Sequence, residues 1–108
     1  MTAPFEELAG LDKLIHEPAR LAITTALSAC EHADFLYLQR LTGLSKGNLS
    51  AHLAKLEGAG LVELDKRFVG KTPQTRVRLT AQGAETVGEH WDRFAGLRDA
   101  STRWDGPG

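Results

Sequence analysis

Polar side chains that can donate and accept hydrogen bonds gather in the middle of the chain, in the run S-K-G-N-L-S-A-H-L-A-K. A serine and a histidine two positions apart raise the question of nucleophilic catalysis. On a helix, however, Ser50 and His52 point about 200° apart, so they cannot form the hydrogen-bonded pair that activates a hydroxyl. The other groups suit base recognition, because asparagine pairs with both edge atoms of adenine and lysine reaches guanine or phosphate. This run therefore predicts contact with duplex DNA rather than catalysis.

The spacing of leucines predicts the helix that presents these groups. Leu49, Leu53 and Leu56 recur at i, i+4 and i+7, which places them on one buried face. Ser45 can cap the start of this helix, and Gly43 can end the one before it, so two helices meet across a three-residue turn. The opposite face is small, polar and basic, with Gly47, Asn48, Ala51, Ala54 and Lys55, flanked by Lys46, Ser50 and His52.

Two helices are expected before this one. Asp34 can cap a short helix that carries Phe35, Leu38 and Leu41 at i, i+3 and i+6. This helix completes a helix-turn-helix over about residues 34–59. An apolar pattern predicts a first helical segment over about residues 11–30. Pro18 interrupts this pattern and fits best in the first turn of the main helix. Cys30 continues the apolar stripe of that helix, where a thiol behaves as a small hydrophobic group.

Alternating residues after the helix-turn-helix predict a basic β-hairpin, a wing, over about residues 62–79. Its tip, residues 69–74, is interpreted as too long for a two-residue turn. Lys71 lies in the tip, with Arg67 and Arg76 on either side. Arg76 and Arg78 also have a structural interpretation, in which they pair across the strands with acidic residues, and it suits Arg78 better.

The last expected helix covers about residues 81–99 and carries an apolar stripe with two aromatic rings. A domain this small has little core left for those rings, so the stripe indicates a subunit interface. We expect a homodimer held by the first and last helices. The interface residues predicted are Leu14, Val87, Trp91 and Phe94. The tail over about residues 100–108 has no periodicity and is expected to be disordered.

Length and composition exclude several classes of protein. The 108 residues suit one domain, and 42% hydrophobic with 25% charged residues is ordinary globular composition. The net charge is −1, but residues 40–78 hold eight basic and three acidic residues. A single cysteine allows neither an intrachain disulfide nor a cysteine pair for zinc, and no metal site, catalytic residue or cofactor is predicted. With no signal peptide or membrane span in the sequence, we expect a cytoplasmic protein.

Three motifs together resemble winged helix-turn-helix transcriptional regulators of the MarR and ArsR type. They are L-T-G-L-S-K-G-N-L-S-A-H-L-A-K-L-E-G-A-G-L-V, the wing that ends in R-V-R-L-T, and T-A-Q-G. H-E-P-A-R-L-A-I in the first helix matches as well, so the resemblance covers nearly the whole chain. It implies an α+β fold, mostly α, with a two-stranded wing and a C-terminal dimerisation helix.

The resemblance also implies a function, a dimer that binds double-stranded DNA at a pseudo-palindromic operator. The implied DNA contacts are Ser45, Lys46, Asn48, Ser50, His52 and Lys55 in the helix, and Arg67, Lys71 and Arg76 in the wing. Whether the protein binds a small-molecule effector is left open, because MarR-type proteins are usually longer than this chain. The alternative function is a winged-helix module that binds another protein, a use to which the same fold is put.

Overall fold

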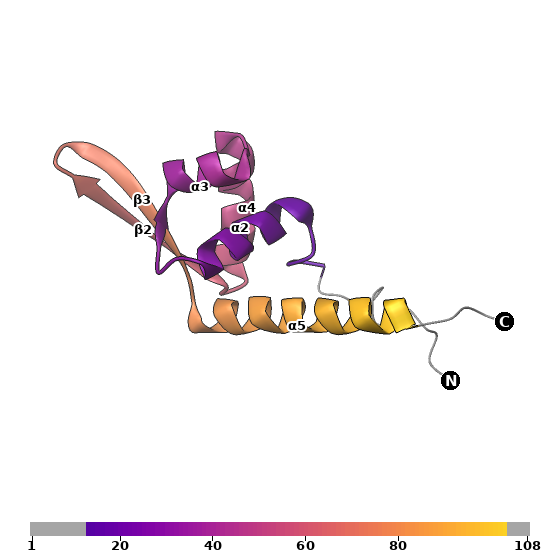
Figure 1. The fold of residues 1–108 in the computed structure, drawn as a ribbon. Coiled ribbons are helices and arrows are strands. Elements are labelled where there is room, and N and C mark those ends of the chain that lie inside the picture. Colours follow the sequence, from indigo (N-terminus) through magenta and orange to yellow (C-terminus); the bar gives the residue numbers. More distant parts are fainter. Residues whose placement is uncertain (1–12, 104–108) are drawn as a thin grey trace.

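The structure, a computed structural model, describes residues 13–103. Three helices pack into a compact body from which a β-hairpin projects on one side and a long helix on the other (Figure 1). The elements in chain order are α2 Pro18–Ser28, β1 Ala33–Asp34, α3 Phe35–Thr42, α4 Lys46–Gly58, β2 Val62–Val69, β3 Thr72–Leu79 and α5 Ala81–Arg103. The architecture is the predicted one, four helices with a two-stranded wing within the described residues.

Helix α2 begins later than the apolar pattern predicted. Its first residue is Pro18, whose fixed φ angle suits a first helical turn, and Glu17 caps it by accepting a hydrogen bond from the backbone N–H of Arg20. Ile15 is fully buried although it lies before the helix, which explains why the apolar pattern starts too early. Residues 11 and 12 of the predicted helix lie outside the described residues.

The helix-turn-helix has the predicted caps. Asp34 accepts a hydrogen bond from the N–H of Tyr37 at 2.7 Å, and Gly43 ends α3 in the left-handed conformation at φ 70°. Ser45 then caps α4 by accepting from the N–H of Asn48 at 3.2 Å. Since these contacts are local, they fix where α3 ends and α4 begins before any tertiary packing is considered.

The hairpin has the predicted bounds, but its strands are longer and its turn is tighter than predicted. Val69 pairs with Thr72, so only Gly70 and Lys71 form the turn. Gly70 has a φ angle of 65°, and a glycine with positive φ at the first turn position is the pattern of a type II′ turn. Pro73 lies in the predicted tip, but the second pair from such a turn has no hydrogen bonds between its two residues, so Pro73 can stand opposite Phe68.

A third strand joins the sheet, in the order β1-β3-β2, all antiparallel. Ala33 and Asp34 of β1 pair with Val77 and Arg76 of β3. Two residues are too few to produce an alternating pattern, so nothing in the sequence indicates this strand. The strand ties the start of α3 to the base of the wing.

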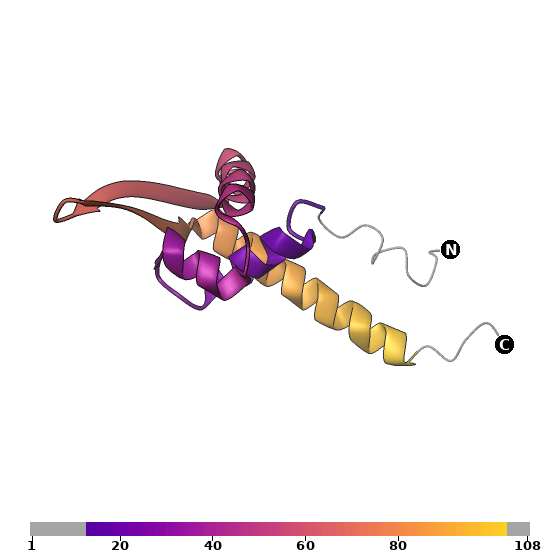
Figure 2. The ribbon, with the colours of Figure 1, turned by 90° about the horizontal axis from the view of Figure 1, so that it is seen from above.

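One core joins the helices to the base of the sheet. It comprises Ile15, Ile23, Leu27, Ala33, Leu38, Leu49, Leu53, Leu56, Leu61, Val62, Val77 and Val87. The three leucines of α4 are all fully buried, as predicted from their spacing. Beyond this core the wing and α5 extend in opposite directions, and Figure 2 shows the same separation from above.

Helix α5 starts directly against the segment that leads into the wing. Thr80 caps it by accepting from the N–H of Gly83 at 2.9 Å. A β-carbon at Gly83 would lie 2.0 Å from the carbonyl oxygen of Leu61, so only glycine allows this close approach. The helix continues to Arg103, past the predicted end near residue 99, and residues 104–108 of the predicted tail, with Trp104, lie outside the described residues.

Candidate nucleic-acid interface

The face of α4 opposite the core is open to solvent. Ser45, Lys46, Asn48, Ser50 and Lys55, all predicted DNA contacts, are exposed. Among the described residues, neither lysine forms an ion pair, and no hydrogen bond occupies the side-chain amide of Asn48. These groups are therefore available to an external partner. The backbone N–H groups of the first turn that have no acceptor within the helix point outward at its N-terminus. This position favours the binding of a phosphate group.

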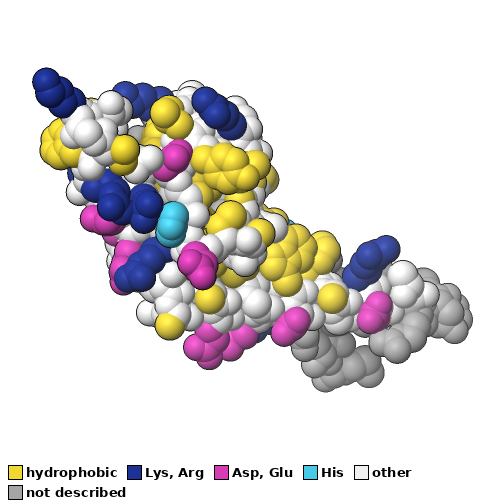
Figure 3. Space-filling model, turned by 60° about the vertical axis from the view of Figure 1, so that its left-hand side comes forward, with side chains coloured by type: hydrophobic (Ala, Val, Ile, Leu, Met, Phe, Trp, Pro, Cys, Tyr) yellow, Lys and Arg dark blue, Asp and Glu magenta, His cyan; other side chains and the backbone are white. Residues whose placement is uncertain are grey.

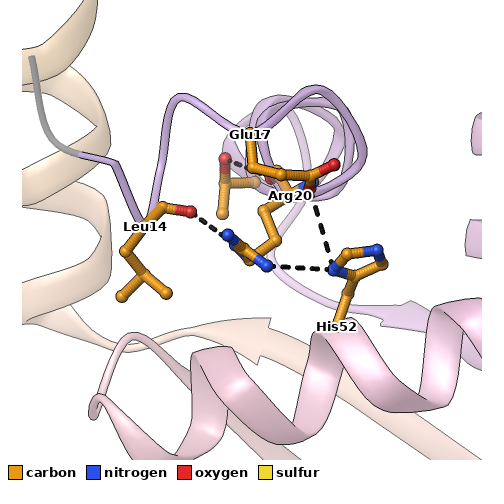
Figure 4. Close-up of polar contacts among 5 residues, drawn as sticks. Leu14, Glu17, Arg20 and His52 are labelled. Atoms are coloured by element: carbon orange, nitrogen blue, oxygen red, sulfur yellow. Dashed lines mark hydrogen bonds and ion pairs between the residues drawn. The ribbon is translucent and has the colours of Figure 1, made fainter.

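His52 is the exception on this helix. Its side chain is only 21% exposed and turns toward the start of α2. Its Nδ1 lies 3.2 Å from Nη1 of Arg20 and 3.7 Å from a carboxylate oxygen of Glu17 (Figure 4). The structure therefore places His52 between two helices of its own chain, whereas the resemblance implied a DNA contact.

Glu17, whose carboxylate lies beside His52, is held in its charged form. The pKa of Glu17 lies below its usual value, first because its carboxylate accepts a hydrogen bond from the backbone N–H of Arg20. The N–H of Ala19 and the charge of Arg20 lower it further, as does His52 in its protonated form, while burial opposes them. Since a lowered pKa favours the ionised form, Glu17 stabilises the fold at neutral pH, and this contribution is lost as the pH falls through its folded-state pKa.

The wing carries basic side chains on an open hairpin. Arg67 and Lys71 are exposed and Arg76 is half-buried, and no ion pair occupies any of the three within the part of the chain that the structure describes. From Lys66 to Arg78 the sequence has no acidic residue. In the space-filling view most of the visible Lys and Arg side chains lie at the wing end of the molecule (Figure 3).

Arg76 and Arg78 differ in whether they form an ion pair with the acidic residue on the neighbouring strand. Arg78 stands opposite Glu63 in the register and donates to its carboxylate through Nε at 3.0 Å. Arg76 stands opposite Asp65, but the two form no ion pair. The structural interpretation is thus confirmed for Arg78, and Arg76 keeps its charge available.

The predicted interface residues divide into two groups. Val87 is only 2% exposed and belongs to the core of its own protomer, so it has almost no surface to offer a partner. Trp91 is 39% exposed, while Leu14 and Phe94 are half-buried. The rings of Trp91 and Phe94 meet edge to face with centroids 5.9 Å apart. An apolar stripe with helical spacing cannot distinguish a face that packs inward from one that packs on a partner, which is why Val87 was included.

Two features had no signal in the sequence because they join distant positions. His16 Nδ1 and His90 Nε2 lie 3.3 Å apart, next to the ring of Phe94. An apolar groove also runs along α2 and is bordered by Tyr37, Leu41 and Trp91. In residues 13–103, no three His, Cys, Asp or Glu side chains gather as metal ligands, and no described helix is long and apolar enough to span a membrane.

Comparison with known proteins places these features in a family. Residues 19–96 match the family described as winged helix DNA-binding domain. The uncharacterized protein MJ0432 of Methanocaldococcus jannaschii is 34% identical over 71 residues, which cover 66% of this chain and 77% of that protein. The HTH-type transcriptional regulator YgaV of Escherichia coli is 36% identical over 63 residues, which cover 58% of this chain and 64% of YgaV.

Solved structures agree with the fold. The transcriptional regulator homologue from Pyrococcus horikoshii OT3 superposes with a TM-score of 0.79 at 31% identity, covering 87% of this chain and 95% of that one. A MarR family regulator from Silicibacter pomeroyi gives a TM-score of 0.66 at 22% identity, over 96% of this chain and 67% of that one. At the lower identity the likeness concerns the fold alone.

Proposed function

Since the chain belongs to the winged helix DNA-binding domain family and is a transcriptional regulator rather than an enzyme, we propose that it binds a specific operator as a dimer. In this proposal α4 enters the major groove and the wing contacts the backbone or the minor groove. The observation that carries it is the open face of α4, which presents Asn48, Lys46 and Lys55 on a helix whose other face is locked into the core. Such a face can enter a major groove and pair with base edges.

The proposed contacts follow from exposure and charge. Base edges would be read by Asn48 and Ser50, with Lys46, Lys55 and Ser45 on bases or phosphates. Arg67, Lys71 and Arg76 of the wing would neutralise phosphates, since the sequence there has no acidic residue between Lys66 and Arg78. His52 is left out of this set because it contacts Glu17 and Arg20.

A homodimer is proposed because one module covers too small a site for strong specificity. Trp91, which is 39% exposed, would lie at its interface with Leu14 and Phe94. Tyr37 and Leu41, on the border of the same apolar groove, add to the exposed apolar surface there. Two copies related by a twofold axis would then place their α4 helices in half-sites about 34 to 36 Å apart. Because such a regulator works on chromosomal DNA, we also propose a cytoplasmic location.

Selection from a random duplex pool tests the operator. The full chain should enrich a sequence with two related half-sites about one helical turn apart. Enrichment of no sequence would contradict the proposal and favour the alternative, a module that binds protein.

Light scattering tests the dimer separately. The proposal predicts the mass of two chains at micromolar concentration. A chain that stays monomeric both alone and with the selected duplex would contradict the dimer. A Trp91→Ala variant that associates as well as the wild type would contradict the proposed interface.

A further inference from the structure

We propose that His52 is a positioning residue, which sets the rotation of the recognition helix α4 through its contacts with α2. The inference rests on the proposed function, since it concerns how α4 presents Asn48 to DNA. Its basis is the α2–α4 polar cluster, formed by Glu17, Arg20 and His52 and shown in Figure 4.

The chemistry of the three groups decides how they are bonded. A guanidinium can only donate, so Nη1 of Arg20 at 3.2 Å requires a lone pair on Nδ1 of His52. A carboxylate can only accept, so Glu17 could engage the same nitrogen only if it carried a proton. The Arg20 distance lies at the edge of the hydrogen-bonding range and the Glu17 distance of 3.7 Å lies beyond it. Nδ1 therefore accepts from Arg20, and the carboxylate of Glu17 lies nearby as a charge partner of the Arg20 guanidinium.

Arg20 is held on both sides of this bond. Its Nε donates to the backbone carbonyl of Leu14 at 2.6 Å, and its own backbone N–H donates to Glu17 at 2.9 Å. The guanidinium is thus fixed to the segment before α2, and the backbone of Arg20 is held by Glu17 in the first turn of that helix. A donor that is already held loses little further freedom when it binds His52, which makes the contact directional.

Packing alone would leave the rotation of α4 less well defined. Its buried side consists of Leu49, Leu53 and Leu56, and apolar contacts have no preferred direction. A hydrogen bond requires a donor and an acceptor at a set distance and angle, so the bond to His52 fixes one point on the helix circumference. Asn48 lies four residues before His52 and Lys55 three after it, where helix neighbours meet. A shift at His52 would therefore displace both groups on the DNA-reading face.

The contact also joins two parts of the proposed regulator. Arg20 binds the backbone of Leu14, which is a proposed interface residue, and the same guanidinium binds α4. The side chain of Arg20 therefore contacts both a residue of the proposed dimer interface and the recognition helix.

Two substitutions at His52 separate positioning from direct DNA contact. Asparagine ends one bond beyond Cγ, where Nδ1 lies, so His52→Asn can still accept from Arg20. Glutamine ends one bond farther out, near Nε2, so His52→Gln loses that acceptor but keeps a polar group that could reach DNA. We expect His52→Gln, His52→Ala and Arg20→Ala to bind the selected duplex about tenfold more weakly, and His52→Asn to bind within about threefold of wild type.

A salt series and a double-mutant cycle complete the test. The slope of log affinity against log salt should stay as in wild type for every His52 variant, because His52 itself contacts no phosphate and the flexible side chain of Lys55 can still reach one after a small rotation of α4. In unfolding experiments, the loss of stability in Arg20→Ala with His52→Ala should be smaller than the sum of the single losses, as for two groups that share a bond.

The outcomes separate the two proposals. Retained binding in His52→Gln with loss in His52→Asn, or a shallower slope in either variant, would assign His52 to DNA and overturn the positioning role. Additive losses in the cycle, or full binding by all variants, would overturn it as well. Wild-type protein that prefers no duplex would overturn the proposed function together with this role, whereas selective wild-type binding with unaffected variants would overturn the positioning role alone.

Discussion

The recognition helix α4 and the wing are next to each other in the sequence but differ in how they are held. In α4 three fully buried leucines and a polar contact to α2 fix the helix on the body. In the outer half of the wing, Phe68 is 73% and Val69 58% exposed, and the strands are held there mainly by each other. Base recognition needs side chains placed to within fractions of an ångström, whereas a phosphate contact tolerates more movement. The difference in support therefore fits the proposed roles, in which α4 reads bases and the wing contacts phosphates.

The largest effect should come from removing an anchor of α4. Leu53→Ala would leave a cavity in the shared core and lower the free energy of unfolding by about 2 to 5 kcal/mol. Phe68→Ala in the wing is the matched comparison and should change it little, because most of that ring is already in water. Thermal or urea unfolding of the two variants checks this, and equal losses would mean that the wing is packed as firmly as the helix.

The next effect concerns base reading by α4. Asn48→Ala should weaken binding to the selected duplex by about 1 to 3 kcal/mol, because a bidentate contact to a base is lost. Affinities for duplexes with single base changes measure this, and the preference should relax at one position in each half-site. An equal loss on every duplex would remove Asn48 from the base-reading set.

Substitutions in the wing should weaken DNA binding without changing which sequence is preferred. Lys71→Ala and Arg76→Ala should weaken the selected and a scrambled duplex by the same factor, since phosphates are present in both. Gel-shift or fluorescence titrations of both duplexes at one salt concentration give the two factors. A loss confined to the selected duplex would mean that the wing reads sequence.

The smallest effect is expected at the base of the wing. Arg78→Ala removes the exposed ion pair with Glu63 and should cost roughly 0.2 to 1 kcal/mol of stability, less at high salt. Binding to DNA should not change, because Arg78 is already paired. Reduced DNA affinity in this variant would show that the arginine exchanges Glu63 for phosphate.

The sequence predicted the features that depend on neighbouring residues. The caps at Asp34 and Ser45 and the leucine face of α4 are local patterns, and the structure contains all of them. The glycine at the end of α3 was predictable for the same reason.

The differences between the predictions and the structure have a common cause, which is that they depend on residues far apart in the chain. The bond between Arg20 and His52 joins positions 32 residues apart, so nothing near His52 indicates that it turns inward. Val87 was predicted at an interface because the same apolar spacing serves a core and a dimer. Pro73 was interpreted as part of a loop because its partner strand could not be seen from its neighbours.

A salt series with three proteins tests the central claim, that α4 reads bases and the wing neutralises phosphate. Wild type, Asn48→Ala and Lys71→Ala would be titrated with the selected duplex from low to high salt. The slope of log affinity against log salt should be the same for wild type and Asn48→Ala, and shallower by roughly 2 per dimer for Lys71→Ala. A slope that changes in Asn48→Ala and stays constant in Lys71→Ala would contradict the account.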